Sequence, residues 1–369
     1  MTRTDMPVVT RIEVMQCRVP LPTPVTLGRT EITYRDYVSL RLVFSDASEG
    51  FATGFERGMA LFDILRRVAP QALGRSADQR TAVRIASLGP APASRPVNIR
   101  AISLINIALW DGWCRQVRKP LWAVLGGARD SLPVMPVIGY GATPERIAAQ
   151  CSELAGRGFK TIKIMIDGTD LAVDADLMRA AARTLPSGTR FGIDAHWSWR
   201  TPAQALATCR IAEDCGAAFI EDPFTPGQWR SVAELQAQIG VPIAVGEDVI
   251  DRHGFRDLAE VAPILRPDAS ASGGIDGLIE VVALASLFDR SIIPHVFPAL
   301  HAHLGFASEA VQCVESILPE VGADPIDQYL TDQPEIRDGM MRATAMPGAS
   351  TGLDWNRLAT LATHTETIQ

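Results

Sequence analysis

Short apolar runs alternate with helix-length amphipathic segments over the second half of the chain, and this alternation limits the fold more than any other feature. Several of the intervening segments begin at Thr-Pro and end at Gly, as in 143–158 and 201–216, which is typical of helix ends. Eight buried strands separated by helices favour a closed parallel barrel over an open sheet. The eight runs, from about residue 133, are LPVMPVIGY, TIKIMI, RFGIDAHW, AAFIEDPF, PIAVGEDV, PILRPDAS, SIIPHVF and VQCVES.

The first part of the chain has a different, α+β pattern. Residues 8–19 and 37–45 alternate apolar and polar side chains as strands do, and residues 60–74 and 98–117 show helical spacing. The intervening segment is rich in Pro, Thr and charge, which predicts a loop over 20–36. Its polar residues would suit a polyhydroxy substrate, although a solvated loop would look the same. They are Thr23, Arg29, Thr30, Glu31, Tyr34 and Arg35.

Composition excludes several classes of protein. The formal net charge of −7 argues against a nucleic-acid-binding surface, which needs a clustered basic face. No run reaches the ~18 apolar residues of a membrane span, and no apolar signal segment opens the chain. The six cysteines form no CxxC pair, which is typical of reduced thiols. We therefore expect a cytoplasmic protein that binds neither nucleic acid nor membranes.

Charged or polar residues close the apolar runs at regular intervals. The catalytic residues of a parallel barrel lie at the C-terminal ends of its strands. Since one βα unit separates each of these residues from the next, we expect their side chains to converge on one mouth. In chain order they are Lys163, Asp194 with His196, Glu221 with Asp222, Glu247 with Asp248, Asp268, His295 and Glu315.

Three of these carboxylates, on Asp194, Glu221 and Glu247, follow adjacent strands. They would repel one another strongly without a cation. Hard oxygen ligands without cysteine indicate Mg²⁺. A single such residue could be a helix cap or an ion-pair partner, but three at the same point of successive units favour a metal site. Asp222 and Asp248 follow their strands and are expected to cap or orient.

Asp268 and His295 end neighbouring strands. A carboxylate behind an imidazole fixes the tautomer of the ring and raises its basicity. A lone histidine near a core is more often structural, but the partner one strand away favours a catalytic dyad. We expect structural roles for His253, His301 and His303.

The ordered set of motifs resembles the mandelate racemase branch of the enolase superfamily. The match covers nearly the whole chain. It rests on ALWD at 108–111, LGG at 125–127, IKIM at 162–165, GIDA at 192–195, IEDP at 220–223, VGED at 245–248, PDAS at 267–270, PHVF at 294–297 and VES at 314–316.

The resemblance implies a (β/α)7β barrel of the TIM type with an α+β N-terminal capping domain that the C-terminal tail completes. We place the capping domain at 1–130, the barrel at 131–324 and the tail at 325–369. Because proteins of this family often assemble, we also expect a homo-oligomer.

The resemblance also implies roles at the site. One Mg²⁺ would be bound by Asp194, Glu221 and Glu247. Asp268 and His295 would form the dyad, and Glu315 would donate a hydrogen bond to the carboxylate of a small-molecule substrate.

One departure from the family pattern bears on the reaction. The family often carries Lys-x-Lys in the second strand, whereas this chain has Lys163-Ile164-Met165. Residues 163 and 165 share the barrel-facing side, because side chains alternate along a strand. Lys163 can hold the substrate carboxylate, but Met165 cannot take a proton, and Lys160 falls on the other face. Two-base racemisation and cycloisomerisation are therefore disfavoured.

The remaining groups suit removal of an α-proton from a carboxylate. Mg²⁺ with Lys163 and Glu315 would stabilise the enediolate, and His295 would be the base. β-Elimination of water also needs an acid. His196, two residues after Asp194 and so expected on the same side of the strand, is the candidate, although it could merely fill the pocket.

An Asp-x-His pairing of this kind resembles that of the superfamily's sugar-acid dehydratases. The leading hypothesis is thus a lyase, a hydro-lyase that dehydrates an acid sugar to a 2-keto-3-deoxy acid. The alternatives are an isomerase, meaning a racemase or epimerase of a 2-hydroxy acid, and a non-catalytic barrel that binds a metal or ligand.

Overall fold

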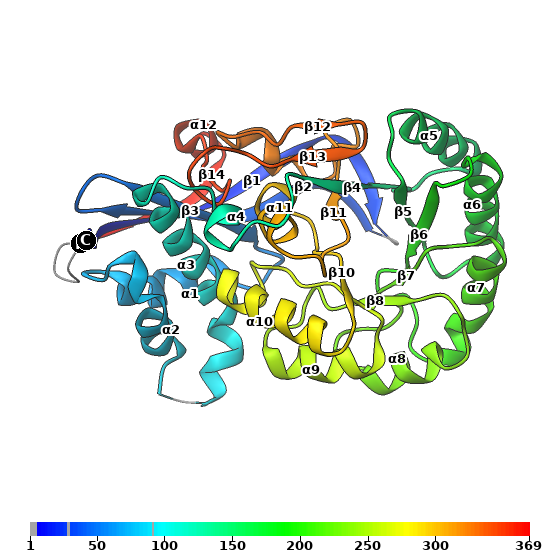
Figure 1. Cartoon of the computed structure of the whole chain (residues 1–369), viewed down its shortest axis with the longest axis horizontal. Helices are drawn as coiled ribbons and strands as arrows, with labels where there is room; N and C mark the ends of the chain where they lie inside the picture. Colours follow the sequence, from blue (N-terminus) through cyan, green and yellow to red (C-terminus); the bar gives the residue numbers. More distant parts are fainter. Residues whose placement is uncertain (1–5, 28–29, 91) are drawn as a thin grey trace.

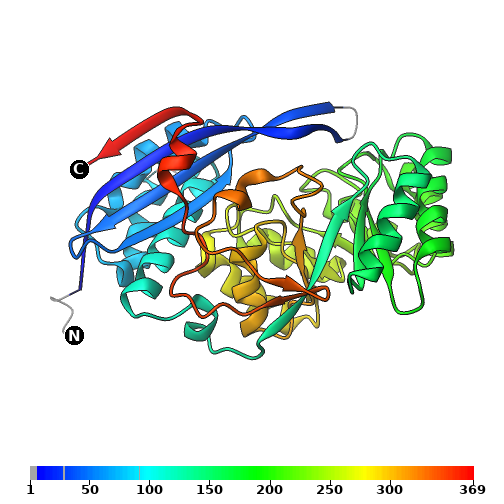
Figure 2. The same ribbon diagram turned by 90° about the horizontal axis from the view of Figure 1, so that it is seen from above.

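A four-stranded antiparallel sheet forms the N-terminal part of the structure, a computed structural model that describes residues 6–27, 30–90 and 92–369. The strand order is β14-β1-β2-β3, so that a strand from the tail lies beside the first strand. Helices cover one face of this sheet (Figure 2). The elements are β1 (Val9–Leu27), β2 (Thr30–Phe44), β3 (Glu49–Phe55), β14 (Ala362–Ile368), α1 (Leu61–Val68), α2 (Arg80–Leu88), α3 (Arg95–Gln116), α4 (Leu121–Val124), and the 3-10 helices η1 (Ala69–Ala72), η2 (Ala77–Gln79) and η3 (Pro92–Ser94).

The prediction of a loop over 20–36 is wrong, because β1 and β2 continue through this segment as a long hairpin. The register shifts between Pro20 and Val25, where the prolines have no N–H to give to the ladder. Pairing resumes at Val25 and Ile32, whose β-branched side chains suit a strand. Figure 2 shows this hairpin reaching from the sheet towards the barrel. Arg29 lies outside the described residues.

The barrel is confirmed, with a strand for each of the predicted apolar runs. Neighbouring strands from β4 to β10 pair in parallel, and β11 pairs in parallel with β4. Ile292 on β10 exchanges backbone hydrogen bonds with Ala310 and Gln312, which closes the ring. The strands are β4 (Ser131–Ile138), β5 (Thr161–Met165), β6 (Arg190–Asp194), β7 (Ile220–Glu221), β8 (Ile243–Val245), β9 (Ile264–Leu265), β10 (Ser291–Ile292) and β11 (Val314–Ser316).

Seven helices alternate with these strands and form an outer arc around them (Figure 1). The predicted helix ends are confirmed at two of them. Thr143 and Thr201 are N-cap residues followed by proline, and Gly158 and Gly216 adopt the left-handed conformation beyond the last turns. The helices are α5 (Pro144–Gly156), α6 (Leu171–Thr184), α7 (Pro202–Asp214), α8 (Trp229–Gln236), α9 (Arg252–Val261), α10 (Gly274–Leu287) and α11 (Pro298–Ala307).

Buried apolar side chains fill the interior of the barrel. They pack directly beneath the polar residues at the strand ends. Phe219 fills part of this space, and its ring lies where a Cβ on Gly192 would be, with a closest approach of 2.3 Å. Glycine is required there by the close approach of the neighbouring strand. The interior cluster consists of Met135, Phe219, Ala244, Ile264, Ile293 and Cys313.

The tail returns to the N-terminal sheet, as predicted, but it pairs with the barrel first. Strand β13 (Met340–Arg342) runs antiparallel to β4, and β14 then pairs with β1. The domain boundaries themselves stay predictions. The remaining tail elements are η4 (Pro325–Tyr329), β12 (Ile336–Arg337) and α12 (Trp355–Ala359).

Two further expectations concern the state of the cysteines and the absence of a membrane span. All six cysteines lie among the described residues and are free thiols, five of them buried. A search of the helices in the described part of the chain finds none with the length and apolar character of a membrane span.

Candidate active site

A cavity of about 440 Å³ lies between the C-terminal ends of the barrel strands and the capping domain. The capping domain contributes Arg35, Phe55, Arg57 and Met59 to its lining. Glu221 is fully buried below this surface. The structure thus brings residues from strand ends far apart in the sequence to one mouth. The predicted site residues in the lining are Lys163, Asp194, His196, Glu247, His295 and Glu315.

Lys163, on β5, lies among three carboxylates. Its Nζ is 2.7 Å from Glu221 Oε1, and 3.0 Å from both Asp194 Oδ2 and Glu315 Oε1. Burial lowers the pKa of the ammonium, but the three carboxylates outweigh burial and raise it well above its ordinary value. Lys163 is therefore a charged group at the centre of the site.

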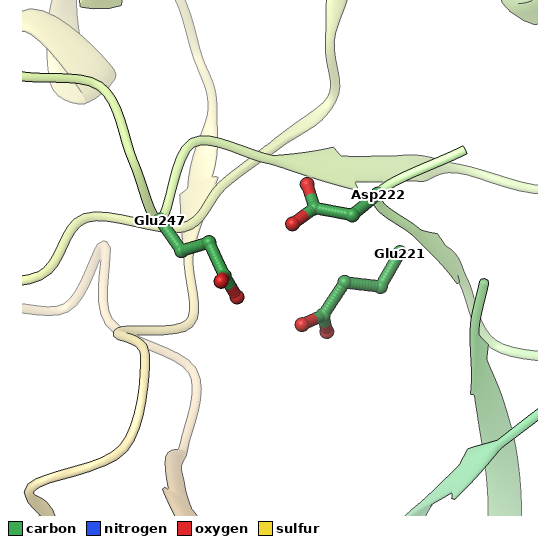
Figure 3. Close-up of side chains that lie close together, drawn as sticks. All are labelled: Glu221, Asp222 and Glu247. Carbon is green, nitrogen blue, oxygen red and sulfur yellow. The ribbon is translucent and has the colours of Figure 1, made fainter. Parts of the chain in front are cut away.

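Glu221, Asp222 and Glu247 each offer an oxygen within 4.8 Å of the others, and their carboxylates face a common space (Figure 3). Glu221 Oε2 is buried and has no hydrogen-bond partner among the described residues. Burial raises the pKa of Glu221 and of Asp222 well above the usual range. A divalent cation would give the free oxygen a partner and favour the ionised carboxylates. The donor set, which is entirely oxygen, fits Mg²⁺.

This cluster differs in one member from the expected triad. Asp222 belongs to it and Asp194 does not; Asp194 Oδ2 is 3.0 Å from Lys163 Nζ, and its Oδ1 accepts a hydrogen bond from the backbone N–H of His196. Strand β7 ends at Glu221, and Asp222 has a left-handed backbone, with a φ of 40°. The sequence argument took one carboxylate from each strand end and expected Asp222, which follows its strand, to cap or orient. Asp222 Oδ2 also accepts a hydrogen bond from Trp197 Nε1 at 3.1 Å.

His295 lies between two carboxylates. Its Nδ1 is 3.1 Å from Asp268 Oδ2, and its Nε2 is 3.2 Å from Glu247 Oε2. Burial raises the pKa of Asp268, but the hydrogen bond with His295 and the charge of the imidazole lower it below its usual value. The backbone N–H of Ser270 also donates to Asp268, at 2.7 Å. An ionised Asp268 fixes Nδ1 as the donor and turns Nε2 towards the cavity.

His196 lines the cavity, but not for the reason given by the sequence. Strand β6 ends at Asp194, and both His196 and Trp197 have left-handed backbones, with φ of 45° and 61°. The two rings stack with their centroids 4.4 Å apart. The position of His196 is therefore set by a strained turn rather than by strand alternation. Burial lowers the pKa of its imidazole.

Met165 lines the cavity beside Lys163, as side-chain alternation on β5 predicts. Lys160 is exposed to solvent. The histidines expected to be structural lie away from the lining of the cavity. His301 accepts a hydrogen bond from the Ala269 N–H at 3.0 Å, His303 accepts one from the Trp122 N–H at 3.1 Å, and neither is in the cavity lining. His253 is exposed.

Arg266 is a buried member of the site that the sequence argument missed. It lies just after β9 with no exposed surface, and its Nη2 donates to Glu221 Oε1 at 2.9 Å and also to Glu315. Its Nη1 donates to the carbonyl oxygen of Ile293 at 3.0 Å. The signal was an arginine directly after the apolar residues Ile264 and Leu265, inside the predicted strand run PILRPDAS. A buried arginine needs charged partners, and here the partners are two site carboxylates.

Arg57 was also missed, since no motif marks it. It lies in the turn after β3 with a φ of 45°, over the ring of Phe55. Its Nη1 is 3.3 Å from Glu247 Oε1 and 3.5 Å from Asp248 Oδ1. The contact joins residues 190 positions apart in the sequence, so only the fold reveals it.

Glu315 is ionised in this arrangement. Burial raises the pKa of its carboxyl group, but Arg266 and Lys163 outweigh burial and hold the pKa well below its usual value. The group therefore accepts a hydrogen bond from Arg266 and forms an ion pair with Lys163. Its expected role as a donor to substrate stays a prediction.

The fold and the site together define a class: a capped (β/α)7β barrel whose mouth gathers carboxylates, a lysine and a histidine–aspartate pair. Comparison with known proteins gives the family. Residues 146–357 match the family described as "Enolase C-terminal domain-like". The chain belongs to the enolase superfamily, in its mandelate racemase and muconate lactonizing branch, and is an enzyme of that superfamily.

Relatives named for two different reactions are similar to this chain. The D-galactonate dehydratase of Ralstonia nicotianae is 30% identical over 281 residues, which cover 70% of this chain and 72% of the relative. The L-Ala-D/L-Glu epimerase of Bacillus subtilis is 25% identical over 287 residues, which cover 74% and 77%.

A solved structure supports the fold. The L-talarate dehydratase of Polaromonas sp. JS666, complexed with Mg and L-glucarate, superposes with a TM-score of 0.87 at 23% identity. The match covers 98% of this chain and 99% of that one.

Proposed function

We propose that the protein uses Mg²⁺ to abstract the α-proton of a carboxylate substrate and dehydrates an acid sugar to a 2-keto-3-deoxy acid. The observation that carries the proposal is His295, whose Nδ1 is held by buried Asp268 while its Nε2 faces the cavity beside the carboxylate cluster. The dehydratase names among the relatives support the same reaction.

The metal would be held by Glu221 and Glu247 with Asp194, the triad expected from the sequence, and Asp222 is close enough to contribute or to orient the others. When bound, Mg²⁺ supplies positive charge that stabilises the substrate's carboxylate oxygens as negative charge builds up on them. The free Glu221 Oε2 and the oxygen-only donors support this assignment. One ion per site is proposed.

The protein residues would divide the remaining work. His295 Nε2 accepts the α-proton, and Asp268 stabilises the imidazolium that forms. The Lys163 ammonium holds a substrate carboxylate oxygen and stabilises the enediolate. His196, acting in its protonated form, donates a proton to the leaving hydroxyl group as the Cβ–O bond of the enediolate breaks, so that water departs and the resulting enol tautomerises to the 2-keto-3-deoxy product. The apolar cluster beneath the site keeps bulk water from the reacting atoms.

The test is a screen of purified protein with Mg²⁺ in deuterated buffer against acid sugars. Semicarbazide detects keto acids, and mass spectrometry detects α-deuteration. Keto product from one or a few sugars would establish the reaction, and complete silence across the library would contradict it.

Two variants separate the proposed roles. His295→Asn keeps a donor to Asp268 but has no base, so turnover is expected to fall by about 10²–10⁴-fold. His196→Asn is expected to stop dehydration and spare α-proton exchange. Full dehydratase activity in this variant would remove His196 from the mechanism. His253→Asn, at an exposed position on α9, is the matched control.

An epimerase of 2-hydroxy acids is the second candidate. The epimerase relative and the presence of two histidines in the cavity lining favour it. It predicts deuterium uptake without keto product. A non-catalytic barrel would instead bind Mg²⁺ without either signal. A homo-oligomer and a cytoplasmic location stay predictions.

A further inference from the structure

The cavity lining contains three cationic side chains, and two of them are already neutralised. Lys163 is bound to three carboxylates, and Arg57 is paired with Glu247 and Asp248. The third is Arg35, which forms no ion pair with any carboxylate in the described ranges 6–27, 30–90 and 92–369. The lining therefore presents one cation whose charge the protein leaves without a direct partner.

A backbone contact outside the cavity lining fixes the position of the Arg35 side chain. Arg35 lies on β2, paired with Val19 of β1, and its side chain is partly buried. Its Nε donates to the carbonyl oxygen of Ala323 at 3.0 Å. The neighbouring acid, Asp324, accepts a hydrogen bond from Tyr37 instead. Because Nε is fixed, the two terminal nitrogens of the guanidinium remain for a ligand in the cavity.

Tyr140 adds a second polar group on the same lining. It follows β4, and its hydroxyl makes no hydrogen bond with the described part of the chain. Burial raises the pKa of this hydroxyl above its usual value, although the charges of Lys163 and Arg35 act in the opposite direction. The hydroxyl is therefore a neutral donor within electrostatic reach of both cations.

The reacting end of the substrate does not account for Arg35. In the proposed mechanism that carboxylate is held by Lys163 and the metal, so Arg35 is free for a different part of the molecule. A guanidinium with two free nitrogens matches a carboxylate in geometry and charge, and the pair is stronger than a hydrogen bond to a neutral hydroxyl. A neutral end would leave the two terminal nitrogens of Arg35 without an ion-pair partner.

We propose that Arg35, assisted by Tyr140, binds a second carboxylate, and that the substrate is a diacid sugar rather than a monoacid one. The proposal rests on the proposed function for the placement of the first carboxylate. A cavity of about 440 Å³ is within the range for small ligands held at both ends. Among acid sugars of one configuration, the site would thus select by the charge of the end that does not react.

The test measures binding and turnover separately, with pairs of sugar acids that share a configuration and differ only in a terminal CH₂OH or carboxylate. Calorimetry with Mg²⁺ is expected to show the diacid binding on the order of 10- to 100-fold more tightly than its monoacid partner. Arg35→Met is expected to remove most of this ratio. Arg35→Lys, which keeps the charge, is expected to restore part of it.

Arg183→Met, on the exposed face of α6, is the matched control and should keep the wild-type ratio. Thermal melts of each variant identify any that fail to fold, and for those Tyr140→Phe provides the second test, with an expected lower diacid-to-monoacid ratio. Equal affinity for the members of every pair, or an unchanged ratio in a folded Arg35→Met protein, overturns the inference.

The two proposals fail in different ways. Keto product from monoacids alone would overturn the diacid inference and leave the proposed dehydration standing. Arg35-dependent binding of diacids without any keto product would support the inference and remove the proposed reaction.

Discussion

Replacing Arg266 with Met is expected to destabilise the protein through charge rather than volume. Arg266 donates to Glu221 Oε1 at 2.9 Å with no exposed surface. At that distance the attraction of two unit charges is about 6 kcal/mol for an effective dielectric constant near 20, and desolvation offsets much of it. Leaving the carboxylates buried without this partner costs about 3–5 kcal/mol in the free energy of unfolding. At about 2 °C per kcal/mol, the melting temperature should fall by roughly 6–10 °C.

The assay is calorimetric melting with EDTA and with saturating Mg²⁺. Glu221 also belongs to the carboxylate cluster, so a bound cation would replace part of the lost charge. Mg²⁺ is thus expected to raise the melting temperature of Arg266→Met more than that of the wild type.

Arg129→Met is the matched control, because Arg129 donates to the carbonyl oxygens of Gly305 and Ser308, at 2.7 and 3.0 Å, and pairs with no carboxylate of the described chain. Its response to Mg²⁺ should equal that of the wild type. If the deficit of Arg266→Met is the same with EDTA and with Mg²⁺, the reasoning that Arg266 balances the site's negative charge is refuted.

Two further predictions concern stability. Gly192→Ala would place a Cβ 2.3 Å from the ring of Phe219 and should cost about 1–3 kcal/mol in urea unfolding, whereas Gly156→Ala, with open space around it, should cost nothing measurable. Burial and the charge of Asp324 raise the pKa of Asp327 to about 8, so the native state holds this proton more tightly than the unfolded state. Stability should therefore fall as pH rises from about 4 to 8. Asp327→Asn should flatten that slope in melts across this range, and parallel profiles for the two proteins would contradict the assignment.

The barrel could be predicted because each strand carries its own signal. An apolar run predicts a buried strand, and the polar residue that follows it, such as Asp194, Glu221 or His295, predicts where the strand ends. The hairpin over 20–36 could not be predicted in this way, because its two strands are stabilised by pairing with each other. The prolines at its start are also residues typical of loops. Local composition does not contain that tertiary pairing.

The site was predictable only as far as the strands extend. Lys163 and Met165 share a face because both lie within β5. Asp222 and His196 lie just beyond their strands, with positive φ, and a period of two residues says nothing about such positions. Arg35 was among the polar residues singled out in the sequence, but the cavity that its guanidinium reaches is formed by distant segments.

The tail has a consequence for engineering this scaffold. Strand β13 is hydrogen-bonded to the first barrel strand, and β14 is hydrogen-bonded to the first strand of the capping sheet. The tail therefore connects the barrel to the capping domain through backbone pairing. Transplanting the capping sheet onto another barrel would therefore need both the N-terminal strands and this distant segment. A chimera made at a single crossover point would separate β14 from its partner and leave an unpaired sheet edge, which invites aggregation.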